Sequence, residues 1–366
     1  MSLYVGLMSG TSMDGIDAAL LDLPSNQLIY GITKQYDIDV KKRLDDLILG
    51  KSLTLAAICQ LNTLIGREFA QTVNQLLLEA KISPKKIQAI GSHGQTVCHD
   101  TSGNIPYTLQ LGCAHTISSL TGITVVADFR TRDLVNGGQG APFAPLYHQQ
   151  IFSKVNDPVA VVNIGGIANV TFIVKNQMTA GWDVGPGNCL MDTWIYKNQG
   201  IFFDESGTWA SKGEIIQPLL EHLLQDPFFR LGSPKSIGKE YFSLSWLQKH
   251  LQPNYKSIDV QATLLALTAH TIAETILNRS DEVKQLYLCG GGAHNTHLKK
   301  TLANLLPGIV VKSTADLGHS PDYLEAMMFA WLAAQTINRI PVDLTSITGS
   351  KGVAILGAIY PIINSC

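Results

Sequence analysis

The sequence is poor in charged residues and has no marked excess of either sign. Only 15% of its 366 residues are Asp, Glu, Lys or Arg, and the formal net charge is −2. It contains no block of like charges of the kind that binds nucleic acid or an anionic membrane surface. Hydrophobic residues make up 45% of the chain, which argues against disorder. The length suits about two domains of 100–200 residues each.

The sequence also shows no pattern that predicts secretion or a membrane span. No cationic segment followed by an apolar stretch opens it, and the longest apolar runs, 326–334 and 352–363, are too short to span a bilayer. The six cysteines are scattered and form no C-x-x-C pair, which indicates reduced thiols rather than disulfides or metal ligands. We therefore expect a cytoplasmic protein with no metal site of its own and no nucleic-acid or membrane partner.

The first motif is a polar glycine turn between two short apolar segments within residues 4–22. Glycine lets the backbone take positive φ and approach a ligand closely, and the N–H groups and hydroxyls of such a turn bind phosphate. Carboxylates beside a phosphate require a cation between them. The turn therefore predicts a phosphate-binding hairpin for a magnesium nucleotide, with an ordinary polar hairpin as the alternative. Its candidate ATP-binding residues are Gly10, Thr11, Ser12, Met13, Asp14, Gly15, Ile16 and Asp17.

This hairpin is not the common P-loop. Gly10 and Gly15 have the G-x-x-x-x-G spacing, but Ile16 and Asp17 stand where Lys and Ser or Thr are required.

A second strand, glycine turn and strand occupy residues 159–174, with Gly165, Gly166 and Asn169 as further candidates for ATP contact. Two such hairpins, each opening one half of the chain, predict duplicated α/β domains that face each other across a cleft. The glycine loop at 136–142 is a candidate for the crossing between them. We expect an N-terminal domain at residues 1–140 and a C-terminal domain at 141–366.

Between the hairpins, apolar periodicity predicts a long helix or a pair of helices over 53–80, and 87–90 reads as a short buried strand. A small-residue turn follows that strand, and its His93 and Gln95 are candidates for ligand contact, with plain loop residues as the alternative. A metal site at His93 is rejected because no thiolate ligand is suitably spaced.

Arg130 follows a β-branched strand predicted at 121–127. Its guanidinium would suit a sugar or a carboxylate, because the planar fork pairs with anions. The alternative is an internal cluster of salt bridges among the arginines and aspartates of 128–133.

Asp183 lies directly before Val184 and a Gly-Pro-Gly-Asn turn that is expected to open a helix, whose N–H groups can face an anion. A carboxylate at such a place is a candidate general base, and the alternative is a simple favourable interaction with the helix dipole. In the irregular stretch that follows, Lys235 and Lys239 are expected to be solvated, with phosphate contact as the alternative.

Three consecutive glycines, Gly290, Gly291 and Gly292, follow a strand predicted at 285–289. They would allow a flat ring to lie against bare backbone, which indicates a nucleoside pocket. No G-x-G-x-x-G occurs to favour a dinucleotide fold.

Ser320 and Pro321 predict the start of a helix. Glu325 would then lie near its N-terminus, either facing the cleft or complementing the helix dipole.

Taken in order, these motifs resemble one family closely, the anhydro-N-acetylmuramic acid kinases of bacterial peptidoglycan recycling. The resemblance covers almost the whole chain, and one mild departure is Val184, where Thr is expected beside the carboxylate. The runs that carry it are 6–17, 91–96, 127–130, 137–142, 163–169, 183–188, 289–295 and 325–326.

The resemblance implies the actin/hexokinase/Hsp70-like fold, with two actin-like (ribonuclease H-like) α/β domains around a nucleotide cleft. It assigns 10–17 and 163–169 to the ATP phosphates, and 290–292 to the adenosine side. It further implies a homodimer, and a reaction that uses ATP, Mg²⁺ and water. That reaction opens the 1,6-anhydro ring of anhydro-N-acetylmuramic acid and gives N-acetylmuramic acid 6-phosphate and ADP.

Asp183 matches the family's catalytic position, where a carboxylate activates the water that attacks the anomeric carbon. The candidates for binding the amino sugar are Gln95, Arg130, Gly185 and Glu325.

Other classes of function are weighed against this one. An ordinary sugar kinase of the same fold would use the carboxylate to deprotonate a substrate hydroxyl. A nucleotide-gated chaperone-like module would usually carry a peptide-binding appendage, and none is visible. A plain glycoside hydrolase would leave the nucleotide hairpins unexplained. Sugar-dependent ADP release separates a kinase from a chaperone, and an ATP requirement separates it from a hydrolase.

Overall fold

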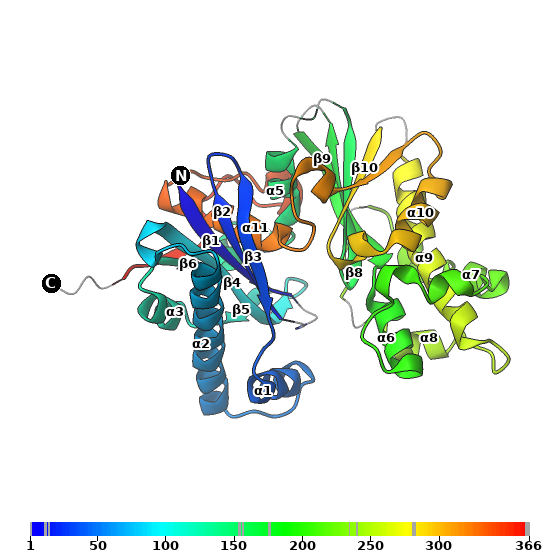
Figure 1. Ribbon diagram of the computed structural model, residues 1–366, viewed down its shortest axis with the longest axis horizontal. Coiled ribbons are helices and arrows are strands. Elements are labelled where there is room, and N and C mark those ends of the chain that lie inside the picture. Colours follow the sequence, from blue (N-terminus) through cyan, green and yellow to red (C-terminus); the bar gives the residue numbers. More distant parts are fainter. Residues whose placement is uncertain are drawn as a thin grey trace. The chain divides into compact units, whose positions relative to one another are not determined.

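The structure is a computed structural model, and Figure 1 traces its elements along the chain. It describes residues 2–10, 13, 15–152, 155, 157–174, 177–233, 235–238, 241–279 and 283–362. The chain forms two compact units: unit 1 is Met1–Tyr147 with Tyr323–Cys366, and unit 2 is His148–Asp322. These limits differ from the predicted domains, 1–140 and 141–366, chiefly because the chain returns to unit 1 at Tyr323.

The sheet of unit 1 has the order β12-β6-β4-β1-β2-β3, with β5 paired to β4. The first three strands form an antiparallel meander, β4 runs parallel to β1, and β6 runs parallel to β4. The strands are β1 (Leu3–Ser9), β2 (Ile16–Asp22), β3 (Gln27–Lys34), β4 (Ile87–Asp100), β5 (Tyr107–Leu111), β6 (Val125–Ala127) and β12 (Ala358–Tyr360).

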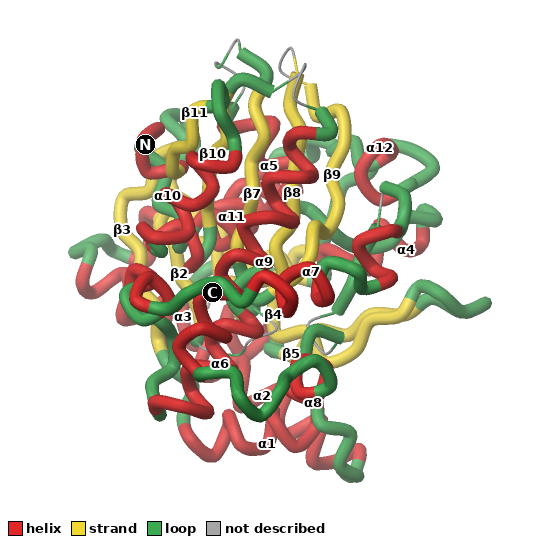
Figure 2. Tube along the Cα trace, turned by 90° about the vertical axis from the view of Figure 1, so that its right-hand side faces the viewer, coloured by secondary structure: helices red, strands yellow, loops and turns green. Residues whose placement is uncertain are grey.

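The sheet of unit 2 repeats this plan in the order β11-β10-β7-β8-β9. Its first three strands again form an antiparallel meander, and β10 and β11 follow in parallel on the other side of β7 (Figure 2). A ribonuclease H-like α/β arrangement therefore occurs twice, which confirms the predicted fold class. The strands are β7 (Val159–Ile164), β8 (Ile167–Val174), β9 (Gln177–Pro186), β10 (Gln285–Cys289) and β11 (Val310–Ser313).

Helices cover both faces of the sheet in unit 1. The predicted helix over 53–80 is confirmed as α2, where the Thr54 hydroxyl accepts a hydrogen bond from the Ala57 N–H and caps the first turn. Its buried face, which includes Ile65 and Phe69, shares one core with Val5 and Leu7 of β1. The helices of this unit are α1 (Ile38–Ile48), α2 (Leu55–Glu79), α3 (Ala114–Thr121), α4 (Phe129–Val135), α11 (Leu324–Ile337) and α12 (Thr345–Thr348).

Helix α11 lies on the opposite face of that sheet and approaches it unusually closely. A Cβ atom at Gly6 would overlap the Ala326 carbonyl, and one at Gly91 would overlap the Phe329 carbonyl. Side chains alternate across a strand, so these two glycines face α11 while Val5 and Leu7 face α2. This packing explains why residues after Tyr323 belong to unit 1.

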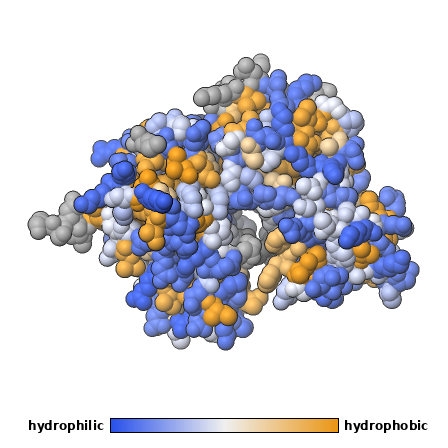
Figure 3. All heavy atoms as spheres, in the orientation of Figure 1, coloured by the Kyte–Doolittle hydropathy of each residue, from blue (hydrophilic) through white to orange (hydrophobic). Residues whose placement is uncertain are grey.

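In unit 2 the long helix α9 forms the centre of the core. Among the described residues it is the one helix long and apolar enough to cross a membrane, but 78% of that apolar window is buried. On the face shown in Figure 3, hydrophobic residues are interspersed with hydrophilic ones. The helices are α5 (Ala144–Ile151, which crosses the unit boundary), α6 (Cys189–Gln199), α7 (Gln217–Leu223), α8 (Leu244–Gln248), α9 (Ser257–Leu277) and α10 (Thr296–Leu305).

Short 3₁₀ turns complete the regular structure. They are η1 (Pro84–Lys86), η2 (Glu205–Gly207), η3 (Ala210–Lys212), η4 (Pro227–Arg230), η5 (Gly291–His294) and η6 (Thr314–Leu317).

Three predicted elements need correction. The turn expected after 87–90 is part of the long strand β4, because β5 pairs with its second half. The strand expected over 121–127 is confined to Val125–Ala127, since Thr121 ends α3 and Gly122 caps it in the left-handed region. The helix expected from Ser320 begins at Leu324.

Candidate active site

Asp183 lies near the end of β9, where it pairs in register with Asn169 of β8. The turn that follows β9 is bonded to the second glycine hairpin, because the Asn188 N–H donates to the Gly165 carbonyl at 2.8 Å. The fold of unit 2 thus brings the candidate base and the candidate phosphate hairpin together at one end of the sheet. Helix α6 begins at Cys189, directly after the turn, as predicted.

One oxygen of the Asp183 carboxylate carries all of its hydrogen bonds within the described part of the chain. Oδ2 accepts the Ser236 hydroxyl at 3.0 Å and the Ile237 N–H at 2.9 Å. Burial raises the pKa of Asp183, and these two donors act in the opposite direction. The carboxylate therefore has a partly desolvated, neutral environment with one oxygen left over, which suits a general base.

Sequence reasoning missed these two donors. Ser236 and Ile237 are more than 50 residues from Asp183 in the chain, and no pattern in the irregular stretch marks them. Lys235 also differs from its expected solvated state, since its ammonium donates to the Phe228 and Phe229 carbonyls. Lys239 lies outside the described residues.

The second hairpin offers backbone groups to a ligand. Gly165 and Gly166 have room, because an added Cβ would meet no neighbour nearer than 3.7 Å. Their carbonyls accept hydrogen bonds from the turn after β9, whereas among the described residues no backbone hydrogen bond outside the regular elements uses their N–H groups. Backbone N–H groups on a glycine turn are a feature that binds phosphate.

Two of the three consecutive glycines are required for close packing, and only the middle one leaves room for a ligand. A Cβ at Gly290 would overlap the Asn163 side chain, and one at Gly292 would overlap Ile164. Gly290 also has a φ of 75°, in the region that favours glycine. Only Gly291 is exposed and has open space, so the bare backbone expected for a flat ring is limited to this residue.

In the first hairpin, Thr11, Ser12 and Asp14 lie outside the described residues. The side chains of Met13 and Ile16 belong to the hydrophobic core of unit 1, so these residues can meet a ligand only through their backbone. The Met13 N–H donates to the Gly10 carbonyl at 3.1 Å, and Ile16 pairs in register with Lys34 of β3.

Asp17 is the described carboxylate of this hairpin. Its Oδ1 accepts the Thr33 hydroxyl at 2.6 Å.

Gln95 is fully buried and supports the first hairpin from β4. Its Nε2 donates to the Gly10 carbonyl at 3.2 Å, and its Oε1 lies 2.7 Å from the Ser9 hydroxyl. The Tyr36 hydroxyl also donates to Oε1, at 3.4 Å. The structure thus gives this amide a scaffolding role, and the sugar contact assigned to it stays a prediction.

Arg130, in the first turn of α4, contacts His93 of β4. Its Nε donates to His93 Nε2 at 3.0 Å, so His93 is neutral with its proton on Nδ1. Burial and the charge of Arg130 both lower the pKa of His93 well below its usual range. The His93 ring also packs on Phe329 of α11, with centroids 4.7 Å apart.

Glu325, in the first turn of α11, acts on the same arginine. Desolvation lowers the pKa of Arg130 to about 10, and the negative charge of Glu325 opposes that shift. The alternative of a salt-bridge cluster within 128–133 is wrong for the buried aspartate there, because Asp133 accepts the Gly140 N–H and the Thr348 hydroxyl instead. The structure therefore brings Arg130 and Glu325 together in unit 1.

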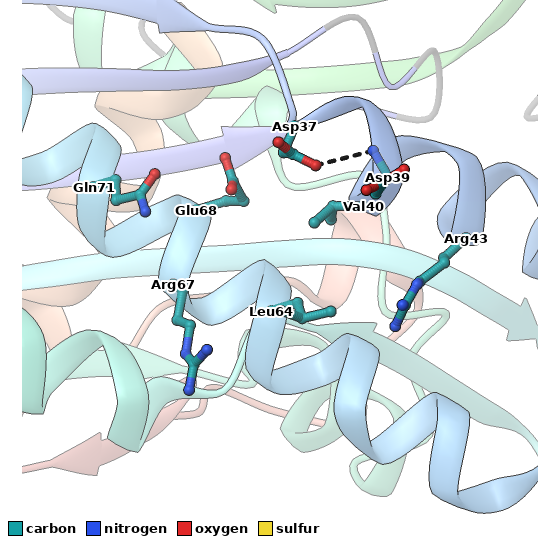
Figure 4. Close-up of a pocket in the computed structure, with 8 residues that line it drawn as sticks. All are labelled: Asp37, Asp39, Val40, Arg43, Leu64, Arg67, Glu68 and Gln71. Carbon is teal, nitrogen blue, oxygen red and sulfur yellow. Dashed lines mark hydrogen bonds between the residues drawn. The ribbon is translucent and has the colours of Figure 1, made fainter.

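A separate hollow lies between α1 and α2 (Figure 4). Two of its acidic residues are already engaged, since Asp37 caps α1 through the Asp39 N–H and Glu68 pairs with Lys34 at 2.7 Å. None of the predicted site residues lines it. The lining residues are Asp37, Asp39, Val40, Arg43, Leu64, Arg67, Glu68 and Gln71.

Within the described ranges, no group of three or more His, Cys, Asp or Glu residues is arranged to hold a metal ion. No disulfide joins any of the five described cysteines.

A family model described as anhydro-N-acetylmuramic acid kinase matches residues 2–362. The chain belongs to this family. It is 84% identical to the anhydro-N-acetylmuramic acid kinase of Legionella pneumophila (strain Corby), over 100% of both chains. It is 48% identical to the kinase of that name from Xylella fastidiosa (strain Temecula1), over 98% of this chain and 96% of the relative. The resemblance read from the motifs is thereby confirmed.

Among solved structures, the chain is similar to a ROK family glucokinase from Streptomyces griseus in complex with glucose and AMPPNP. The identity is 13% and the TM-score 0.42, over 91% of this chain and 100% of that one. A likeness at this level carries no argument about function.

Proposed function

We propose that Asp183 is the general base of an ATP-dependent anhydro-N-acetylmuramic acid kinase. The activity itself follows from the family, whose model covers nearly the whole chain. The observation that supports the role of Asp183 is its half-buried carboxylate, held through Oδ2 alone beside the second glycine hairpin. In sequence, Asp183 also stands at the family's catalytic position.

In this reaction water attacks the anomeric carbon of the 1,6-anhydro sugar and gives a proton to Asp183. The bond between that carbon and the ring oxygen O6 breaks, and O6 takes the γ-phosphoryl group of ATP. The products are N-acetylmuramic acid 6-phosphate and ADP. No second carboxylic acid is needed to protonate the leaving oxygen, because phosphoryl transfer neutralises it.

ATP is proposed to lie against the backbone of the two glycine hairpins. Gly165 and Gly166, opposite the strand-paired Asn169, offer N–H groups to phosphate in unit 2, and residues 10–17 would do so in unit 1. Gly290–Gly292 would border the adenosine, with Gly291 as the open position.

Mg²⁺ is part of the same proposal. Bound with ATP, it would neutralise charge on the β- and γ-phosphates. Asp17 offers a carboxylate of the kind that this cation prefers, and Asp14 would be the second.

Arg130 and Glu325 are proposed to read the amino sugar, with Gln95 and Gly185 as further contacts. A guanidinium pairs well with a carboxylate such as the lactyl group of the substrate. Glu325 can accept hydrogen bonds from sugar hydroxyls or from the acetamido N–H.

A cytoplasmic homodimer completes the proposal. It is supported by the family resemblance and by scattered cysteines that suit a reducing compartment. Light scattering of the purified protein would test the dimer, and a monomer mass would overturn it.

A coupled assay of ADP release tests the activity, with mass spectrometry of the sugar product. We expect ADP to form with the anhydro sugar and not with glucose, and the product to gain both a phosphoryl group and a water. A phosphorylated sugar that keeps its anhydro ring would indicate an ordinary kinase. ADP release that is independent of sugar would indicate a nucleotide-gated module.

A further inference from the structure

The short loop at 235–238, which follows η4, contacts Asp183 through both its backbone and a side chain. The Asp183 N–H donates to the Lys235 carbonyl at 2.9 Å. The Ser236 hydroxyl and the Ile237 N–H then donate back to Asp183 Oδ2. Three consecutive loop residues are thus bonded to one residue of β9.

The loop is also fixed on its other side. The Lys235 ammonium donates to the Phe228 carbonyl at 3.0 Å and lies 4.5 Å from the centroid of the Phe228 ring. Phe228 is buried in the hydrophobic core of unit 2. The donors that face Asp183 therefore have a rigid support, although Ser236 itself is exposed.

We propose that residues 235–237 are a positioning element that holds Oδ2 of Asp183 and leaves Oδ1 to accept the proton of the attacking water. The inference rests on the proposed role of Asp183 as the base. A base must present a free lone pair in a fixed direction, and an orienting group commonly supplies that direction. Two donors on one oxygen fix the carboxylate plane, while Oδ1 makes no hydrogen bond within the described residues.

The electrostatics agree with this geometry. Burial raises the pKa of Asp183, and among the described residues the opposing effects come from Ile237 and Ser236. No described charged group shifts this pKa: the ammonium of Lys235 is turned to the carbonyls of η4, and Glu274 of α9 acts on Lys235. The strand neighbour Asn169 is uncharged. The loop donors therefore favour the ionised form that a base needs.

The experiment compares Ser236→Ala with the wild-type protein in pH profiles of kcat. Removing one neutral donor should raise the pKa of the acidic limb by about half to one unit and lower the plateau kcat about 3–10-fold, because the carboxylate is less well oriented. Ser236→Thr keeps a hydroxyl and should restore both values. Ser233→Ala is the matched control, since this serine is exposed in the same stretch and shows no hydrogen bond to any residue that the structure describes.

A second readout does not depend on turnover. Carboxyl ¹³C NMR of labelled Asp, assigned with Asp183→Asn, should show an upward shift in the pKa of Asp183 in Ser236→Ala and none in Ser233→Ala. An unchanged pKa in both readouts would overturn the inference, as would an effect confined to KM. If the wild-type protein opens no anhydro sugar, the proposed function fails separately while the NMR titration still decides whether the loop controls this carboxylate.

Discussion

The two units hold their polar candidates in opposite ways. In unit 1, Arg130 is placed by a neutral histidine and a carboxylate that come from a strand and a helix. In unit 2, Asp183 is held by a hydroxyl and a backbone N–H from an irregular loop. A charged group tolerates desolvation when an opposite charge is near. A carboxylate base needs a pKa that is not strongly lowered, and neutral donors lower it less than a nearby positive charge does. The contrast fits a binding role for Arg130 and a chemical role for Asp183.

The glycines of the two units also differ in the space that surrounds them. Gly6 and Gly91 of unit 1 are needed because α11 occupies the space above them. At Gly165 and Gly166 of unit 2 an added Cβ would make only ordinary van der Waals contacts, at 3.7 and 3.9 Å. Glycine thus serves helix packing at Gly6 and Gly91, whereas at Gly165 and Gly166 it leaves room for the ligand that we propose.

The largest effect should come from Asp183→Asn. The amide oxygen can still accept from Ser236 and Ile237, so the geometry is kept while the proton acceptor is lost. We expect kcat to fall about 10²–10⁴-fold, with nucleotide affinity unchanged in a fluorescence titration. Activity within tenfold of wild type would remove Asp183 from the chemistry.

The second largest effect should come from Arg130→Lys. Lysine lacks the Nε–H that His93 accepts and the planar fork that suits a carboxylate. We expect KM for the sugar to rise about 10–100-fold with kcat little changed, in line with about 1.5–3 kcal/mol for a charged hydrogen bond. Arg132→Lys is the matched control, since Arg132 is exposed on the same helix. Equal effects at both positions would contradict the assignment.

Two alanine variants test whether Gly91 serves helix packing and Gly165 serves ATP binding. Gly91→Ala forces α11 away from the sheet and should lower the free energy of unfolding by about 1–3 kcal/mol, measured by urea denaturation. Gly165→Ala should leave stability within about 0.5 kcal/mol but weaken ATP binding. Gly232→Ala, where nothing lies within 4 Å, controls for the substitution itself. A destabilised Gly165→Ala with normal ATP binding would reverse our assignment.

The smallest effect concerns pH and a buried histidine of unit 2. Burial lowers the pKa of His148 to about 3, and its Nδ1 lies 3.0 Å from the Thr171 hydroxyl. The unfolded chain binds a proton near pH 6.5 and the folded chain does not, so the free energy of unfolding falls as pH drops below about 6.5. At pH 5 the loss should be about 2 kcal/mol.

His148→Gln should remove this part of the pH dependence in urea denaturation at pH 7 and pH 5. Other groups titrate in both proteins, so the difference between them is the readout. An identical pH dependence in the variant would show that His148 is protonated in the folded state.

Much of the fold could be predicted from local patterns in the sequence. The apolar period of α2 and the two glycine hairpins were read directly, and β10 was predicted with its observed bounds, Gln285–Cys289. These elements are strongly patterned because each buries one face or both. The extent of β4 was not accessible, because its second half is a strand only through pairing with β5.

The candidate site could be predicted only in part from the sequence. Asp183 stood out because it precedes a glycine turn that opens a helix. Arg130 stood out because it follows a strand, at a place where ligand contacts are common in α/β folds. The donors that hold Asp183 were not predicted, since Ser236 and Ile237 belong to a loop without periodicity. The return of α11 to unit 1 was also missed, because Gly6 and Gly91 reveal their role only once the helix is in place.

The most direct test of the central claim is one turnover of anhydro-N-acetylmuramic acid with magnesium ATP in ¹⁸O-labelled water, read early by mass spectrometry. Unlabelled product in the same water corrects for exchange at the anomeric carbon. We predict label in the anomeric hydroxyl and none in the phosphoryl group, with no labelled product from Asp183→Asn. Label in the phosphoryl group, or an undiminished yield from Asp183→Asn, would contradict the account.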